Sequence, residues 1–299
     1  IMSLVWSVLL ATCSAVLAET SSDFEFVAIG DMPYSKADDA QLARVIDWTN
    51  QQKPAFTVHI GDIKFGGSLC SDYNLQQVKT DFFSQFKQPF VYTPGDNEWT
   101  DCHRFLCGSY DPIERLDFLR QLFFDPSDAR YQNLPVGTVR QSDVQADEHA
   151  QMVENMLWEQ GHVVFLTIHQ IGSHNNYPVS AKQVKPKTEL PKDKQAQKAE
   201  YESRNAANLD WMRYAFDKAR ADNRRAVVLF FHSDPMFEYT LEQRIGLQDF
   251  HELLFDEARK FPGEILLIHG DSHRFRFDYP LRTKDDELIQ NVRRMNIFG

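Results

Sequence analysis

Positive charge is scarce in this sequence, and cysteine is scarcer still. Acidic residues outnumber basic residues by 43 to 32, so the formal net charge is −11. This balance excludes a protein that coats nucleic acid or binds anionic membranes through a broadly positive surface. The 4 cysteines match no zinc-knuckle spacing. With 13 glycines and 13 prolines in 299 residues, collagen-like and low-complexity proteins are excluded too, and the length fits one large α/β domain or two small ones.

Long apolar runs are absent except at the start of the chain. Residues 1–18 carry no charge, and the small-residue exit at Val16-Leu17-Ala18 predicts cleavage after Ala18. We therefore expect a secretory signal peptide over 1–18, a secreted or periplasmic protein, and no stable membrane span after cleavage. The alternative is an uncleaved anchor, because 18 apolar residues just span a bilayer.

Three cysteines follow the expected cleavage point. Cys70 lies eight residues after Asp62 and Cys102 lies six residues after Asp96, so each follows a strand-end loop of the same kind. Because an exported chain permits disulfides, we predict a Cys70–Cys102 bond and a free Cys107. Three unpaired thiols are the alternative.

Short apolar runs alternate with helical patterns along the chain, which is typical of buried strands in an α/β fold. The expected strands span residues 24–29, 56–60, 90–94, 163–168, 226–231, 265–268 and 293–298. Apolar periodicity predicts helices over residues 113–123, 209–219 and 247–254.

The segment over residues 180–204 is polar, with six lysines between 182 and 198 and two prolines, and we expect a solvated loop there. Residues 19–299 are expected to form one domain. The sequence stops at the end of its last apolar run, so we expect one or two further strands of this domain after residue 299. The sequence does not indicate an oligomeric state.

Five of the expected strands deliver Asp or His at their carboxyl ends, the edge where ligands bind in open α/β sheets. These residues are Asp31, Asp62, Asp96, His232, Asp271 and His273. A single Gly-Asp pair often only makes a turn, but several carboxylates at one edge repel each other, and divalent cations relieve that repulsion. Mixed Asp and His ligands suit Mn, Fe, Zn or similar metals and two-metal hydrolysis. His269 has the same parity as Asp271 and His273, so an extended backbone would place all three on one side.

The order and spacing of these motifs resemble the calcineurin-like metallophosphoesterase superfamily from about Asp23 to Gly299. The resemblance implies an α/β fold, a four-layer α/β/β/α sandwich with a metal site at the strand carboxyl ends. Gly61-Asp62 matches the segment whose Asp bridges two metals, and His232 matches the family's lone His.

Three motifs depart from the family pattern. Pro33 stands where the family has a His ligand, so one contact is lost unless Tyr34, Lys64 or water replaces it. Asp96-Asn97 aligns with the family's Asn-His, which puts Asp96 at a ligand position and Asn97 at the catalytic His position.

The third departure is Asp271, which replaces the first His of Gly-His-x-His, unless a slip lets His269 serve instead. Four aspartates, including Asp271, would supply a charge of −4 where the family site has −2, so two divalent ions would be neutralised. Such an oxygen-rich site favours Mn or Mg over Zn.

The resemblance assigns a role to each ligand. Asp31, Asp62 and His273 would hold the first of two divalent ions. The second would be held by Asp62, Asp96, His232 and either Asp271 or His269. Metal-bound hydroxide would then attack the phosphorus of a small phosphorylated substrate in line with the departing alcohol.

The candidate catalytic residues are Asn97 and His232, which match family positions, and His103, which is expected from its place on the same loop as Asn97. A carboxamide such as Asn97 cannot act as a general acid at neutral pH, and His103 is the nearest substitute on the same loop. Two other functions stay open. One is a degenerate relative that binds metal or phosphate without turnover, and the other is a non-catalytic extracellular binding domain.

Overall fold

The structure is a computed structural model that describes residues 23–128, 133–283 and 285–299. The expected signal peptide over residues 1–18 lies outside the described residues, so export and cleavage stay predictions. Within the described ranges, no helix combines the length and the apolar character needed to cross a bilayer.

The first sheet has three parallel strands in the order β1-β2-β3. Its strands are β1 (Phe26–Ile29), β2 (Phe56–His59) and β3 (Phe90–Tyr92), which confirm three of the expected runs. The segments around this sheet form α1 (Lys36–Gln52), α2 (Asp72–Gln77), η1 (Val78–Phe82), η2 (Phe83–Gln85), η3 (Thr100–His103), η4 (Phe105–Cys107) and α3 (Pro112–Phe123). Helix α1 begins after Ser35, whose side chain accepts a hydrogen bond from the Asp38 amide, as an N-cap does.

The second sheet has seven strands in the order β4-β5-β6-β7-β8-β10-β9. They are β4 (Val139–Arg140), β5 (Met156–Gln160), β6 (Val163–Thr167), β7 (Ala226–Phe230), β8 (Glu264–His269), β9 (Arg276–Asp278) and β10 (Val292–Asn296). Strands β6, β7, β8 and β10 are parallel neighbours, while β4, β5 and β9 pair antiparallel at the two sides. The helices that follow these strands are α4 (Gln141–Val144), α5 (Ala146–His149), α6 (Gly172–Asn175), α7 (Lys194–Ala221), η6 (Leu241–Gln243) and α8 (Gln248–Lys260).

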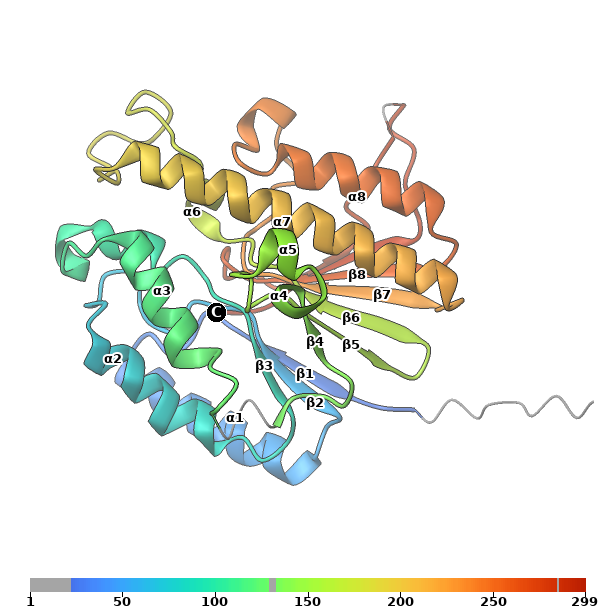
Figure 1. The fold of residues 1–299 in the computed structure, drawn as a ribbon, viewed down its shortest axis with the longest axis horizontal. Helices are drawn as coiled ribbons and strands as arrows, with labels where there is room; N and C mark the ends of the chain where they lie inside the picture. The colour runs from blue at the N-terminus through green and yellow to red at the C-terminus, as the bar shows by residue number, and fades with distance from the viewer. Residues whose placement is uncertain (1–22, 129–132, 284) are drawn as a thin grey trace, which may run out of the picture.

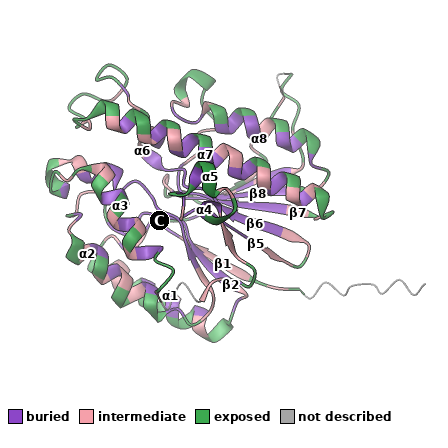
Figure 2. Cartoon of the chain, viewed as in Figure 1, coloured by how far each residue is buried: buried purple, intermediate pink, exposed green. Residues whose placement is uncertain are grey.

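Apolar side chains join the two sheets to each other and to the helices. Phe56 of the first sheet packs edge-on against Trp158 of the second, with ring centroids 5.1 Å apart, inside a buried cluster that both sheets share. A second cluster, which includes Trp211 and Leu254, joins the second sheet to α7 and α8. Figure 1 shows α1, α2 and α3 beside the first sheet and α7 and α8 over the second, and Figure 2 shows that the helices expose only their outer faces.

The expected loop over residues 180–204 is wrong in its second half. Helix α7 begins at Lys194, and the side chain of Asp193 caps it by accepting hydrogen bonds from two amides. Several polar side chains of this helix are buried, and Arg204 forms an ion pair with Glu200 at 2.5 Å. Arg204 is completely buried. Charged residues that form buried ion pairs cannot be distinguished by composition from charged residues in water. The sequence therefore did not predict that helix α7 begins within this segment.

The predicted Cys70–Cys102 disulfide is present, with Cα atoms 5.7 Å apart, and Cys107 is free and buried. All three cysteines pack together. The bond joins the segment after β2 to the segment after β3, the two segments that carry Asp62 and Asp96. A disulfide of this kind is compatible with an oxidising compartment.

Candidate metal centre

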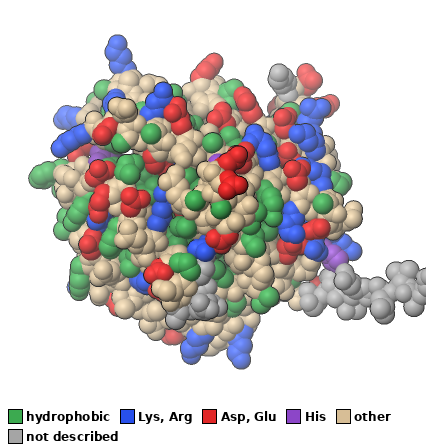
Figure 3. All heavy atoms as spheres, in the orientation of Figure 1, with side chains coloured by type: hydrophobic (Ala, Val, Ile, Leu, Met, Phe, Trp, Pro, Cys, Tyr) green, Lys and Arg blue, Asp and Glu red, His purple; other side chains and the backbone are tan. Residues whose placement is uncertain are grey.

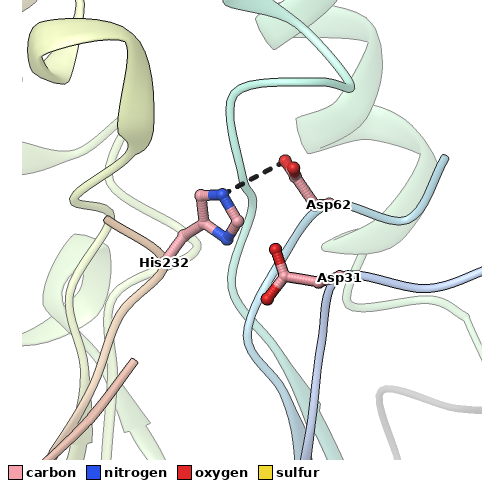
Figure 4. A group of neighbouring side chains, drawn as sticks. All are labelled: Asp31, Asp62 and His232. Atoms are coloured by element: carbon pink, nitrogen blue, oxygen red, sulfur yellow. Dashed lines mark ion pairs between the residues drawn. The ribbon is translucent and has the colours of Figure 1, made fainter. Parts of the chain in front are cut away.

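Three predicted ligands meet where β1, β2 and β7 end. Ligand atoms of Asp31, Asp62 and His232 all lie within 4.8 Å of one another, and Figure 4 shows the imidazole pointing toward both carboxylates. The backbone of Asp31 and Asp62 is left-handed, with φ of 54° and 56°. Non-glycine residues seldom adopt this conformation, and such strained positions cluster at functional sites.

Asp96 joins the group from the end of β3. Gly61, with φ of 96°, packs so tightly on the backbone of Gly95 that no side chain would fit, which brings the two Gly-Asp segments together. The Nε2 atom of His232 lies 3.2 Å from Asp62 Oδ1 and 3.1 Å from Asp96 Oδ1. Its Nδ1 atom lies 3.0 Å from the carbonyl oxygen of Ile60, which accepts a hydrogen bond if Nδ1 is protonated. The imidazole therefore turns Nε2 toward the carboxylates.

The segment after β8 supplies Asp271 and His273 but not His269. Ligand atoms of Asp96, His232 and Asp271 lie within 4.8 Å of one another, and His273 Nε2 lies 3.3 Å from Asp31 Oδ1. The expectation that His269 faces the same side is wrong, because Asp271 and His273 adopt left-handed φ of 70° and 54° and the backbone is not extended there.

His269 instead ends β8, where it is fully buried and its ring stacks on Phe231 with centroids 5.7 Å apart. Among the described residues it belongs to no group of candidate metal ligands. Of the two residues that the sequence left open for the second ion, the geometry favours Asp271.

Tyr34 occupies the space next to Pro33. Its hydroxyl donates a hydrogen bond to Asp62 Oδ2 at 2.9 Å and lies 3.4 Å from Asp31 Oδ1 and from His273 Nε2. Burial and the charges of Asp62 and Asp31 raise the pKa of this phenol far above its usual value, so it stays protonated. Lys64 points elsewhere, because its ammonium donates to two backbone carbonyls.

The two remaining catalytic candidates are placed very differently. Asn97 lies against the cluster, and its Nδ2 atom donates to Asp62 Oδ2 at 2.5 Å. His103 does not reach the cluster, because its Nδ1 lies 2.6 Å from the Thr100 carbonyl oxygen and its Nε2 lies 3.0 Å from the Glu189 carbonyl oxygen. It lines a separate pocket of about 550 Å³.

Two supporting residues escaped the sequence analysis. Glu98 Oε1 accepts hydrogen bonds from the backbone amides of Asp62 and Gly95, at 3.1 and 2.7 Å, and so fixes the two Gly-Asp segments relative to each other. Ser173 donates to Asp96 Oδ2 at 2.7 Å from a distant part of the chain. Glu98 directly follows the Gly-Asp-Asn motif and could have been noticed, whereas no pattern in the sequence marks Ser173.

The cluster holds more negative charge than its environment balances. Burial raises the pKa of Asp62 well above its usual value, and the nearby Asp96 and Glu98 add to the rise. Burial and the Asp96 charge raise the pKa of Asp271 to about 6. For His232, burial opposes protonation, but the carboxylates of Asp62 and Asp96 outweigh it and raise the pKa of the imidazole well above its usual value. One imidazolium therefore faces several carboxylates in a buried space.

No protein-family model and no curated protein matches the sequence. Among solved structures, the chain is similar to a dimetal phosphatase from Danio rerio, with a TM-score of 0.53 and 12% sequence identity over 92% of this chain and 87% of that one. It also aligns with the sulfate thiohydrolase SoxB from Thermus thermophilus, with 14% identity over 87% of this chain and 37% of that one, but the TM-score of 0.38 supports no conclusion. The chain is thus a mixed α/β protein with two sheets, whose fold is similar to that of a dimetal phosphatase.

Proposed function

We propose that this protein is a metal-dependent phosphoesterase that hydrolyses small phosphate esters with two divalent cations. One observation carries the proposal. Asp96 Oδ1 and His232 Nε2 are buried and 3.1 Å apart, so they form an ion pair only while the imidazole is protonated, and no Lys or Arg of the described residues forms an ion pair with Asp96. A cation bound by both atoms would balance the carboxylate without a proton on the imidazole.

The residues at the strand ends fit two such ions. Asp31, Asp62 and His273 would hold the first, with the Tyr34 hydroxyl beside them. The second would be held by Asp62, Asp96, His232 and Asp271. The four carboxylates would balance two divalent charges, and their oxygen atoms favour Mn or Mg. When bound, divalent cations supply activation of a water nucleophile and neutralisation of phosphate charge.

The other polar side chains of the site would orient a metal ligand and contact the substrate. Tyr34 and Asn97 both hold Asp62 Oδ2, at 2.9 and 2.5 Å, and so fix the orientation of the carboxylate that both ions would share. His273 is 43% exposed, so its imidazole reaches solvent, where a substrate oxygen would arrive. Neither Tyr34, with its raised pKa, nor the carboxamide of Asn97 would give up a proton near neutral pH.

A binding-only relative is the second candidate, and one observation favours it. Asn97 stands at the position of the family's catalytic His, and both ring nitrogens of His103 face backbone carbonyls. The site therefore offers no evident acid for a poor leaving group.

We also propose the four-layer α/β/β/α arrangement for the domain over residues 19–299 and its export. Three apolar clusters support the layers: one shared by the two sheets, one that joins the second sheet to α7 and α8, and one that joins Leu42 and Ile46 of α1 to Phe86 and other residues around the first sheet. The disulfide supports export.

The test is hydrolysis of p-nitrophenyl phosphate in the presence of Mn²⁺. Asp62→Asn should lower turnover at least about 1000-fold, because loss of the shared ligand removes metal assistance worth several kcal/mol. Asp217→Asn, which changes an exposed carboxylate on α7, should keep the wild-type rate. Wild-type turnover by Asp62→Asn would overturn the site assignment. Absence of turnover in a wild-type protein that binds two ions would favour the binding-only relative.

A further inference from the structure

Aromatic side chains adjoin two residues of the candidate metal centre, Tyr34 and His273. The ring of Phe65 lies against the ring of Tyr34, with centroids 6.0 Å apart. Phe275, two residues after His273, stacks on Phe298 with centroids 5.2 Å apart. We call Tyr34, Phe65, Phe275 and Phe298 the aromatic rim. His273 connects the two pairs, because its ring lies 5.4 Å from that of Tyr34.

The rim is continuous with the ligands. The Tyr34 hydroxyl touches Asp62, and His273 Nε2 lies 3.3 Å from Asp31. Gly299, which follows Phe298, packs so closely on the His273 ring that an added Cβ would come within 2.8 Å of it. A molecule whose phosphate group enters the metal centre would therefore have the rest of its structure beside the rim.

The three phenylalanine rings of the aromatic rim are not part of the apolar core. Phe65 is 54% exposed, Phe275 54% and Phe298 68%. A single exposed aromatic residue is ordinary, but several that border a polar centre mark a binding surface. An apolar group that covers these ring faces would gain by removing them from water.

We propose that the substrate is a phosphate ester whose alcohol carries an aromatic or aliphatic apolar group, and that this group lies on the aromatic rim. The proposal rests on the proposed function. In the reaction, a water oxygen bonds to phosphorus while the P–O bond to the alcohol breaks. The released oxygen takes up a proton, and the apolar group leaves unchanged within the alcohol.

Binding tests the rim without turnover. Calorimetry with the Mn²⁺-loaded protein would compare phenylphosphonate with methylphosphonate, which differ only in the apolar group. Wild-type protein should bind phenylphosphonate about 10-fold more tightly, as expected for partial burial of one ring. Phe65→Ser and Phe275→Ser should each reduce this preference to about 3-fold or less. Trp48→Ser, which removes a 53% exposed ring on α1, should keep it.

Turnover gives a second, independent comparison. Phenethyl phosphate and ethyl phosphate have alcohols of similar acidity, so the ratio of their kcat/KM values reports contact and not leaving-group chemistry. The ratio should be about 10 in wild-type protein and near 1 in the Phe65→Ser, Phe275→Ser double variant. A partly unfolded variant would lower both rates and leave the ratio unchanged.

The outcomes separate the two proposals. Hydrolysis of both esters with equal kcat/KM, together with equal binding of both phosphonates, would overturn the rim and leave the phosphoesterase intact. A clear preference for phenylphosphonate without hydrolysis of any ester would support the rim and overturn the phosphoesterase.

Discussion

A comparison of two buried groups of acidic and histidine side chains in the described part of the chain shows that they differ in how their charge is balanced. In the first, Glu154 accepts a hydrogen bond from Arg120 at 2.8 Å and lies 2.7 Å from His169 Nδ1. Burial alone would raise the pKa of Glu154, but the Arg120 and His169 partners hold it far below its usual value. In the second, the candidate metal centre, no Lys or Arg of the described ranges forms an ion pair with the four aspartates.

The difference separates a structural group from a functional one. The charge of an acid that is paired with arginine is balanced within the protein, and removing one partner of such a buried pair destabilises the fold. Several carboxylates that face a single imidazole keep an excess of negative charge, and a cation bound from solution would balance it. Acidic and basic side chains are interspersed over the molecular face in Figure 3, which makes the one-sided charge of the buried cluster all the more distinctive.

The largest effect on stability is expected from the balanced group. Arg120→Met would leave Glu154 buried beside His169 alone, and we expect a loss of about 3–5 kcal/mol in the free energy of unfolding. Arg213→Met, which breaks an ion pair of a 51% exposed arginine, should cost less than about 1 kcal/mol. Urea unfolding of both variants checks this. Asp271→Asn removes a carboxyl whose pKa burial and Asp96 raise to about 6, and it should leave the metal-free protein as stable as wild type or more so near neutral pH. A large loss there would contradict the comparison.

The disulfide beside the cluster should contribute nearly as much. Cys70 and Cys102 are 32 residues apart in the sequence. Without their bond the unfolded chain gains conformational entropy, and the chain-entropy model gives a loss of about 3–4 kcal/mol in the free energy of unfolding. The Cys70→Ser, Cys102→Ser double variant tests this by urea unfolding, with Cys107→Ser as the control that keeps the bond. Peptide mapping without reductant should recover Cys70 linked to Cys102. Free thiols at both positions in protein recovered from an oxidising compartment would refute the bond.

The pH dependence of stability should have opposite signs in the two groups. The pKa of Asp271 is about 6 in the folded protein and 3.8 when unperturbed, so its contribution to stability is present below about pH 4 and is lost as the pH rises through 6. The raised pKa of His232 acts in the same direction, with loss above pH 6.5. The lowered pKa of Glu154 acts in the opposite direction, because its contribution is present above pH 4.5 and is lost in acid.

Thermal unfolding should therefore show the cluster as a difference between metal-free wild type and metal-free Asp271→Asn. Burial lowers the pKa of His59, His251 and His269 to about 4, and this stabilises both proteins as the pH rises from 5 to 8, so the Tm of the wild type should rise less over this range than that of Asp271→Asn. Adding Mn²⁺ should raise the Tm of the wild type more at pH 8 than at pH 5, because a bound cation takes the place of the lost protons. An equal change of Tm with pH in the two metal-free proteins would show that the cluster is already balanced.

The smallest effect concerns His103. Because both of its ring nitrogens face backbone carbonyls away from the cluster, His103→Ala should not change how the rate depends on the leaving group. Without an acid in the site, that dependence should be steep, with aryl phosphates cleaved far faster than alkyl phosphates. A series of substituted phenyl and alkyl phosphates measures it. A shallow dependence that His103→Ala makes steeper would restore His103 as the acid.

Much of the site was predictable because parallel strands end at a common edge. Apolar runs that stop at Gly-Asp or His identified the strands, and their shared edge brought Asp31, Asp62, Asp96 and His232 together as expected. The spacing after β8 gave a wrong expectation for His269. Asp271 and His273 have left-handed backbone and turn the chain, so His269 does not face the same side as these two residues. Alternation of side chains holds only while the backbone stays extended.

Contacts between distant segments were beyond the sequence. The role of Ser173 depends on how the turn after β6 meets the end of β3, and no local pattern records that meeting. The start of α7 was missed for a related reason, because Arg204 is polar by composition but buried by its partners. Composition reports which groups a segment carries, and only the fold decides whether water or protein satisfies them.

Metal content is the most direct test of the account. The protein should be purified without added metal, loaded with Mn²⁺ and freed of excess ion by gel filtration. Its manganese content per chain is then measured by elemental mass spectrometry. The charge imbalance at Asp31, Asp62, Asp96 and Asp271 predicts about two ions per chain, and fewer in Asp62→Asn. A folded wild-type protein that retains no ion near neutral pH would contradict the account.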